Sequence, residues 1–182
     1  MKHVIHIFGP SGSGTTTLGQ LLCRETGYTL LDTDEYFWLP TEPKFLEKRP
    51  REARIALMEA EIDRADHAVI SGSVADWGLP LLPRFTLAVR IEMDPEVRIA
   101  RLIAREKQRY GPRIDPGGDM HRQHLEFVEW ARGYETGGPD MRSRARHDLW
   151  EQHFRCPILR LDGAEAPENH LQKVLQALET MT

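Results

Sequence analysis

The chain has 182 residues, 29% of them charged and 40% hydrophobic, and a formal net charge of −4. This length is typical of one domain with a single sizeable core, so we expect residues 1–182 to form a single domain. The negative net charge argues against nucleic acid as a main partner, because proteins that bind it usually carry a large basic excess.

Short apolar runs alternate with helical patterns along the chain. In chain order the predicted elements are strand 4–8, helix 15–25, strand 28–31, helix 51–66, strand 68–70, strand 86–91, helix 95–109, helices 119–134 and 139–153, strand 157–161, and a closing helix over 170–178. Glycine and proline predict a loop over 110–118. The alternation predicts an α/β fold of three layers, with a central parallel sheet of about five strands and helices on both faces.

A glycine-rich loop follows the first predicted strand directly. Gly9 and Gly14 are separated by four residues and followed by Thr15 and Thr16. The phosphate-binding pattern has this glycine spacing, then Lys, then Ser or Thr, so Thr15 stands where Lys is expected. We expect the loop to bind nucleotide phosphates through Gly9, Ser11, Gly12, Ser13, Gly14, Thr15, Thr16 and Thr17. An ordinary turn, or a relic of such a site, is the alternative.

The absent lysine removes a positive charge beside the β- and γ-phosphates. Such a pair at about 4 Å contributes about 4 kcal/mol at an effective dielectric of about 20. Another cation must therefore replace it, or phosphate transfer will be slow.

Asp32 and Asp34 follow the second predicted strand. Ligands of parallel sheets bind beyond the carboxyl ends of the strands, which is where these carboxylates lie. If the strand continues through them, both side chains share a face. One would then hold Mg²⁺ and the other would address an acceptor group. Helix capping or turn formation is the alternative.

Arginines recur along the helix predicted over 95–109. Arg98, Arg101, Arg105 and Arg109 would lie along one side, with apolar residues on the other. Between residues 98 and 122 there are seven Lys or Arg and three Asp or Glu, a local charge of +4. Such a stripe is often only a solvated helix face. The neighbouring glycine-containing loop could instead carry Arg109 and Arg113 towards a bound triphosphate.

Together these motifs resemble those of the small P-loop kinases, the group of nucleoside monophosphate kinases and shikimate kinases. The run from Gly12 to Thr17 is similar to that of archaeal-type cytidylate kinases, which also have Thr at the lysine position. Residues 31–34 resemble the Asp-x-Asp of shikimate kinases, in which the first Asp serves magnesium and the second the acceptor. The arginines of 101–113 resemble those of a lid, here expected over about 105–155. Arginines in 49–54 stand near the expected acceptor region, without a complete substrate signature.

The motifs and the resemblance together predict an ATP-dependent phosphotransferase for a small acceptor, either a nucleotide or a hydroxylated metabolite. Its cofactors would be ATP and Mg²⁺, with Thr16 and Asp32 as magnesium ligands. Asp34 would address the acceptor, and Arg101, Arg105, Arg109 and Arg113 would stabilise charge during transfer. A nucleotide-binding sensor without transfer and a plain NTPase remain alternatives. With no apolar run of roughly 18 residues and no signal-peptide layout, we expect a cytoplasmic protein without a membrane partner.

Overall fold

The computed structural model describes residues 1–42 and 44–181, and within them a five-stranded parallel sheet has the order β2-β3-β1-β4-β5. Its strands are β1 (Val4–Phe8), β2 (Thr29–Asp32), β3 (Ala68–Ser71), β4 (Leu87–Glu92) and β5 (Ile158–Asp162). The expected α/β fold with a parallel sheet is therefore confirmed, and each predicted strand is present within two residues of its expected bounds.

The helices connect the strands and cover the sheet. They are α1 (Thr15–Thr26), α2 (Thr33–Phe37), α3 (Arg51–Arg64), α4 (Pro95–Tyr110), α5 (His121–Arg132), α6 (Arg144–Glu151) and α7 (Pro167–Glu179). Two 3₁₀ segments, η1 (Leu79–Arg84) and η2 (Gly111–Ile114), complete the described part of the chain. The pattern did not predict α2 or η1, and η2 lies within the segment predicted as a loop.

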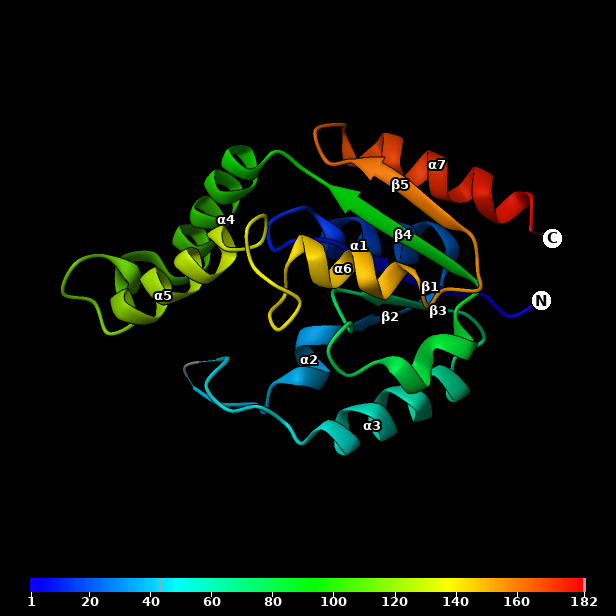
Figure 1. Ribbon diagram of the computed structural model, residues 1–182, viewed down its shortest axis with the longest axis horizontal. Helices are drawn as coiled ribbons and strands as arrows, with labels where there is room; N and C mark the ends of the chain where they lie inside the picture. Colours follow the sequence, from blue (N-terminus) through cyan, green and yellow to red (C-terminus); the bar gives the residue numbers. More distant parts are fainter. Residues whose placement is uncertain (43, 182) are drawn as a thin grey trace.

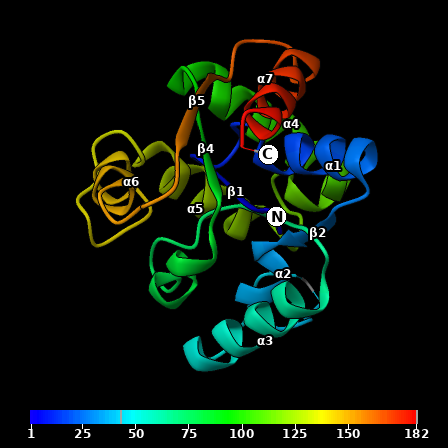
Figure 2. The same ribbon diagram turned by 90° about the vertical axis from the view of Figure 1, so that its right-hand side faces the viewer.

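Helices cover both faces of the sheet (Figures 1 and 2), and a hydrophobic core lies on each face. On one face, α1 and α7 pack through residues such as Leu22 and Val174 against apolar side chains of β1 and β4. On the other face, α3 and α6 pack through Met58 and Trp150. Successive side chains of a strand point to opposite faces of the sheet, so each strand contributes apolar residues to both cores.

Side-chain caps determine where two helices begin, one at the predicted residue and one later than predicted. The Asp94 carboxylate accepts hydrogen bonds from the backbone N–H groups of Glu96 and Val97 at 3.0 and 3.1 Å, which caps α4 in front of Pro95. α6 begins later than the predicted 139, because Ser143 Oγ accepts from the Arg146 N–H at 3.0 Å and fixes the first turn there.

The helices α4 and α5 project beyond the carboxyl ends of the strands, at the left of Figure 1. They pack on each other through Ile99, Leu102, Val128 and Ala131, in a small apolar cluster separate from the two cores. We call α4, η2 and α5 the lid. The lid region expected from sequence, about 105–155, also contains α6, whose Trp150 packs into the core against the sheet.

Candidate active site

A cavity of about 1740 Å³ opens at the carboxyl edge of the sheet, between the sheet and the lid. Pockets for one drug-sized ligand usually measure about 300 to 1,000 Å³, so this cavity has room for more than one small molecule. Every site residue expected from the sequence lines it: Gly9, Ser11, Gly12, Ser13, Gly14, Thr15, Thr16, Thr17, Asp32, Asp34, Arg101, Arg105, Arg109 and Arg113.

The glycine-rich loop, residues 9–16, leads directly into the N-terminus of α1. Gly14 is the N-cap residue and supplies no side-chain cap, so the first N–H groups of α1 face the cavity without one. Within the described chain, the buried Ser13 hydroxyl has no hydrogen-bond partner. Free N–H groups, an unpartnered hydroxyl and the positive end of the helix fit a phosphate group.

The loop rests on Arg98 of α4. Gly12 has a φ of +89°, and a Cβ built there would lie 2.7 Å from the Arg98 carbonyl oxygen, so the close approach requires glycine. The Arg98 guanidinium donates to the Ser11 carbonyl oxygen at 3.1 Å, to the Ala131 carbonyl oxygen at 3.1 Å and to the Glu135 carboxylate at 2.8 Å. This one side chain therefore connects the glycine-rich loop to the C-terminal end of α5.

The interpretation of the arginine stripe as one side of a helix was wrong for Arg98. Its side chain is fully buried, whereas Ile103, expected on the apolar side, is 37% exposed. The buried face of α4 contains Arg98, Ile99, Leu102 and Glu106. Residues 98, 102 and 106 have the i, i+4 spacing of one helix face, and this spacing was the available signal of the buried face. It was missed because two of the three residues are charged, so the face shows no apolar periodicity.

The strand does not continue through the two aspartates, so the condition under which they would share a strand face is not met. β2 ends at Asp32, which is the N-cap of α2, and Asp32 Oδ1 accepts from the Asp34 N–H at 3.0 Å. Asp34 lies in the first turn of the helix. Both still line the cavity, since a carboxylate at an N-cap remains at the carboxyl edge of the sheet. Burial raises the pKa of Asp32, while the positive charge of Arg109 opposes the rise.

The cavity-lining arginines of the lid differ in their partners. Arg101 donates to the Gly163 carbonyl oxygen at 3.1 Å. Arg113 forms ion pairs with Asp119 at 2.8 Å and with Glu42 at 3.1 Å. Within the described residues, Arg101 and Arg109 have no carboxylate within 4.0 Å.

The lid also contacts the segment that follows α2. Besides the ion pair of Arg113 with Glu42, Gln123 Nε2 donates to the Lys44 carbonyl oxygen at 3.2 Å. These contacts lie at the surface, and they join the far end of the lid to the opposite rim of the cavity.

Polar residues outside the expected site set also line the cavity. Arg49, one of the arginines expected near the acceptor region, lies at the wall, and its Nε donates to the Tyr36 carbonyl oxygen at 3.0 Å. Ser73 and Asp76 follow β3, and Arg142 precedes α6. The position of Ser73 after a strand was a signal for it, whereas Asp76 and Arg142 have no local pattern.

Among the described residues, no group of three or more His, Cys, Asp or Glu side chains is arranged to hold a metal ion. Mg²⁺ bound with a nucleotide typically takes one or two protein oxygens plus phosphate oxygens and water. The Thr16 hydroxyl and the Asp32 carboxylate, which line the same cavity, suit that smaller ligand set. In the described part of the chain, no helix is long and apolar enough to span a membrane.

Comparison with known proteins agrees with this geometry. A family model described as "AAA domain" matches residues 5–130, more than half of the chain, and includes the glycine-rich loop, both aspartates and most of the lid. The chain belongs to the AAA domain family. Its P-loop, the glycine-rich loop of this family, is residues 9–16.

Relatives and solved structures place this AAA domain among P-loop proteins with a kinase-like fold. It is 38% identical over 180 residues to "Uncharacterized protein YqaC" of Bacillus subtilis, covering 99% of each chain. It is 27% identical over 113 residues to a cytidylate kinase of Archaeoglobus fulgidus, covering 56% of this chain and 61% of that one. A shikimate kinase structure from Bacteroides thetaiotaomicron shares the fold, with a TM-score of 0.59, 18% identity, and coverage of 97% of this chain and 98% of that one.

Proposed function

We propose that the protein is an ATP-dependent kinase that transfers the γ-phosphate of ATP to a small acceptor, a nucleoside monophosphate or a hydroxylated metabolite. The observation that carries the proposal is that an uncapped helix N-terminus and an acidic helix start face one cavity of about 1740 Å³. That volume suits a nucleotide and an acceptor together. Kinases with this arrangement act mainly by positioning the two substrates and stabilising charge.

Each group has a role in this proposal. The backbone N–H groups of residues 11–16 would hold the β-phosphate, and Thr16 and Asp32 would hold Mg²⁺. When bound, Mg²⁺ neutralises charge on the phosphate oxygens. Asp34 would orient the acceptor and take its proton.

The proposal also requires a substitute for the lysine that Thr15 replaces. The Arg98 charge is unsuitable, because Glu135 compensates it at 2.8 Å and its side chain is buried beneath the P-loop. Arg101, Arg105 and Arg109 line the cavity. Their positive charges are less fully compensated by nearby carboxylates than that of Arg98, so they remain available to a bound phosphate. With Arg113, they would stabilise the charge that develops during transfer.

The deciding experiment measures ATP consumption by the purified protein with Mg²⁺, alone and with pooled nucleoside monophosphates and hydroxylated metabolites. We expect acceptor-dependent turnover that Asp34→Asn reduces by about 10²-fold or more, because general-base groups contribute about 10² to 10⁴. Asp66→Asn, an exposed carboxylate outside the cavity, is the matched control and keeps wild-type turnover.

The Thr15 substitution favours one rival, a sensor that binds nucleotide without transfer. Tight ATP binding with no turnover under any condition would support the sensor and contradict the kinase. Hydrolysis that no acceptor stimulates, and that Thr15→Lys raises, would instead indicate a plain NTPase.

A further inference from the structure

Behind the cavity wall, a buried set of hydrogen-bonded side chains ends at Ser73. Ser73 Oγ lies 3.0 Å from His147 Nε2, and His147 Nδ1 lies 2.9 Å from Tyr134 Oη. The Arg90 guanidinium lies near this tyrosine, and its positive charge opposes the rise in pKa that burial causes in Tyr134. We call Ser73, His147 and Tyr134 the relay. They come from the loop after β3, from α6 and from the turn after α5, and Ser73 is the member that lines the cavity.

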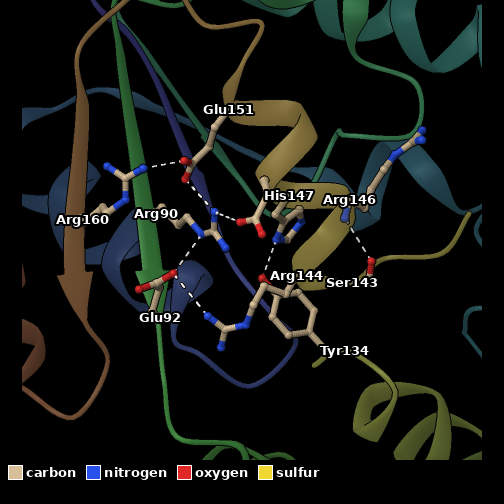
Figure 3. Close-up of polar contacts among 10 residues, drawn as sticks. Arg90, Glu92, Tyr134, Ser143, Arg144, Arg146, His147, Glu151 and Arg160 are labelled. Carbon is tan, nitrogen blue, oxygen red and sulfur yellow. Dashed lines mark hydrogen bonds and ion pairs between the residues drawn. The ribbon is translucent and has the colours of Figure 1, made fainter. Parts of the chain in front are cut away.

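Beside the outer end of the relay, Arg90 is held by ion pairs (Figure 3). Arg90 Nη1 lies 2.7 Å from the Asp148 carboxylate and 2.8 Å from the Glu151 carboxylate. Glu92 faces Arg90 Nε at 3.4 Å. Arg90 is thus a fixed positive charge close to Tyr134 and His147.

The direction of the other hydrogen bonds follows from the charge on His147. Burial, then the nearby charges of Arg142 and Arg90, lower the pKa of His147 well below its usual value. A neutral imidazole has one N–H donor and one acceptor nitrogen. In the described part of the chain, His147 Nδ1 is the acceptor within reach of the Tyr134 hydroxyl hydrogen. Tyr134 therefore donates to Nδ1, and the ring proton resides on Nε2.

This tautomer makes His147 a donor to Ser73. The Ala75 backbone N–H also donates to Ser73 Oγ, at 3.4 Å. A hydroxyl oxygen has two acceptor lone pairs, and these two donors occupy both. The Ser73 hydrogen is then left to donate on the cavity side.

The loop that carries Ser73 is packed against the start of α2. Gly72 has a φ of +109°, and a Cβ built there would lie 2.0 Å from Thr33 Oγ1. Ser73 therefore lies on the wall next to the helix that carries Asp34, the residue assigned to the acceptor. Resting on the kinase proposed above, this places Ser73 on the acceptor side of the cavity.

We propose that Ser73 is a specificity-determining residue whose hydroxyl donates to an oxygen of the acceptor, with Tyr134 and His147 as positioning residues that fix its direction. The acceptor thus carries a carbonyl, hydroxyl or anionic oxygen near the group that is phosphorylated. In an analogue with an N–H group at that position, this donor faces the Ser73 hydroxyl hydrogen, which is also a donor. Both polar groups are then buried without a hydrogen-bond partner, so the analogue is rejected.

The first test needs no substrate. Nitrogen-15 NMR of the histidine rings at neutral pH reports the tautomer of His147, whose signals are assigned by their loss in His147→Gln. We expect the Nε2–H tautomer in the wild type, and a shift towards Nδ1–H in Tyr134→Phe. The Nδ1–H tautomer in the wild type would overturn the proposal, because Ser73 would then donate to His147 rather than into the cavity.

The second test uses the acceptor found by the turnover assay. We expect Ser73→Ala to raise the KM for the acceptor about tenfold and to leave the KM for ATP within about twofold. Ser73→Thr keeps the hydroxyl and restores most of the loss, and Tyr134→Phe, which does not line the cavity, repeats part of it. An unchanged acceptor KM in Ser73→Ala would contradict the proposal. Absence of turnover with any acceptor, with the Nε2–H tautomer retained, would contradict the kinase and leave the oriented donor in place.

Discussion

Lowering the pH should destabilise the protein through His6, a buried residue of β1. Its side chain is fully buried and stacks between the rings of Phe8 and Phe85, at centroid distances of 5.1 and 4.8 Å. The Trp150 indole N–H donates to His6 Nε2 at 3.3 Å, so the neutral ring is the form that fits. Burial lowers the pKa of His6 from 6.5 to about 3.

The size of the effect follows from this pKa. The unfolded chain binds a proton near pH 6.5, and the folded protein does not until about pH 3. Stability is therefore complete above the unfolded pKa and is lost as the pH falls towards 3. Each unit corresponds to about 1.4 kcal/mol, so His6 alone should cost about 2 kcal/mol between about pH 8 and about pH 5. Total stabilities are only about 5 to 15 kcal/mol, so the loss is measurable.

Urea unfolding at several pH values measures this pH-dependent loss of stability. His6→Gln is the comparison variant, because Gln keeps a hydrogen-bond acceptor but does not titrate. The wild type should lose about 2 kcal/mol more than the variant between about pH 8 and about pH 5. NMR titration of the wild-type His6 ring gives a direct reading if the variant folds poorly. The reasoning would be refuted if the free energies of unfolding of the wild type and of His6→Gln changed with pH in parallel. It would also be refuted if His6 were protonated in the folded protein above about pH 5.

Two further variants test contacts around the P-loop and α2. Arg98→Met should lower the free energy of unfolding in urea by about 3 kcal/mol or more and raise the KM for ATP, because Glu135 loses its buried partner. Adding Glu135→Met should recover part of this stability. If the losses from the two substitutions were fully additive, the pairing of Arg98 with Glu135 would be contradicted. Gly72→Ala should destabilise by more than about 1 kcal/mol and reduce turnover, because its Cβ would meet Thr33 Oγ1 at 2.0 Å. Gly27→Ala, which also has a positive φ (+74°) but whose added Cβ would meet no atom within 4 Å, is the control for backbone strain and should leave turnover intact.

The fold and the outline of the site could be predicted because their signals are local. The glycine spacing of residues 9–14 and the apolar run before it occur within eleven residues of sequence, 4–14, and both depend on backbone geometry alone. Alternation of strands and helices then brings the carboxyl ends together, which places Asp32 and Asp34 in the cavity whichever element carries them.

What the sequence could not predict depends on distant partners. Arg98 is buried because its guanidinium meets a carbonyl oxygen 87 residues before it and a carboxylate 37 residues after it. Ser73 and His147 are 74 residues apart. The short helix α2 was missed because Asp32 and Asp34 are as common in turns as at helix starts, and five residues give no helical periodicity.

The contacts of Arg98 also determine which part of the lid can move. Its guanidinium donates to Ser11 of the P-loop and to Ala131 near the end of α5, so this side chain ties the base of the lid to the P-loop. The far end, around η2, is held by the exposed Arg113, whose ion pairs are screened by solvent. We therefore expect the tip of the lid to move more than its base. In the proposed kinase, the P-loop would then keep its shape while the acceptor enters and leaves, and acceptor exchange would not require release of the nucleotide.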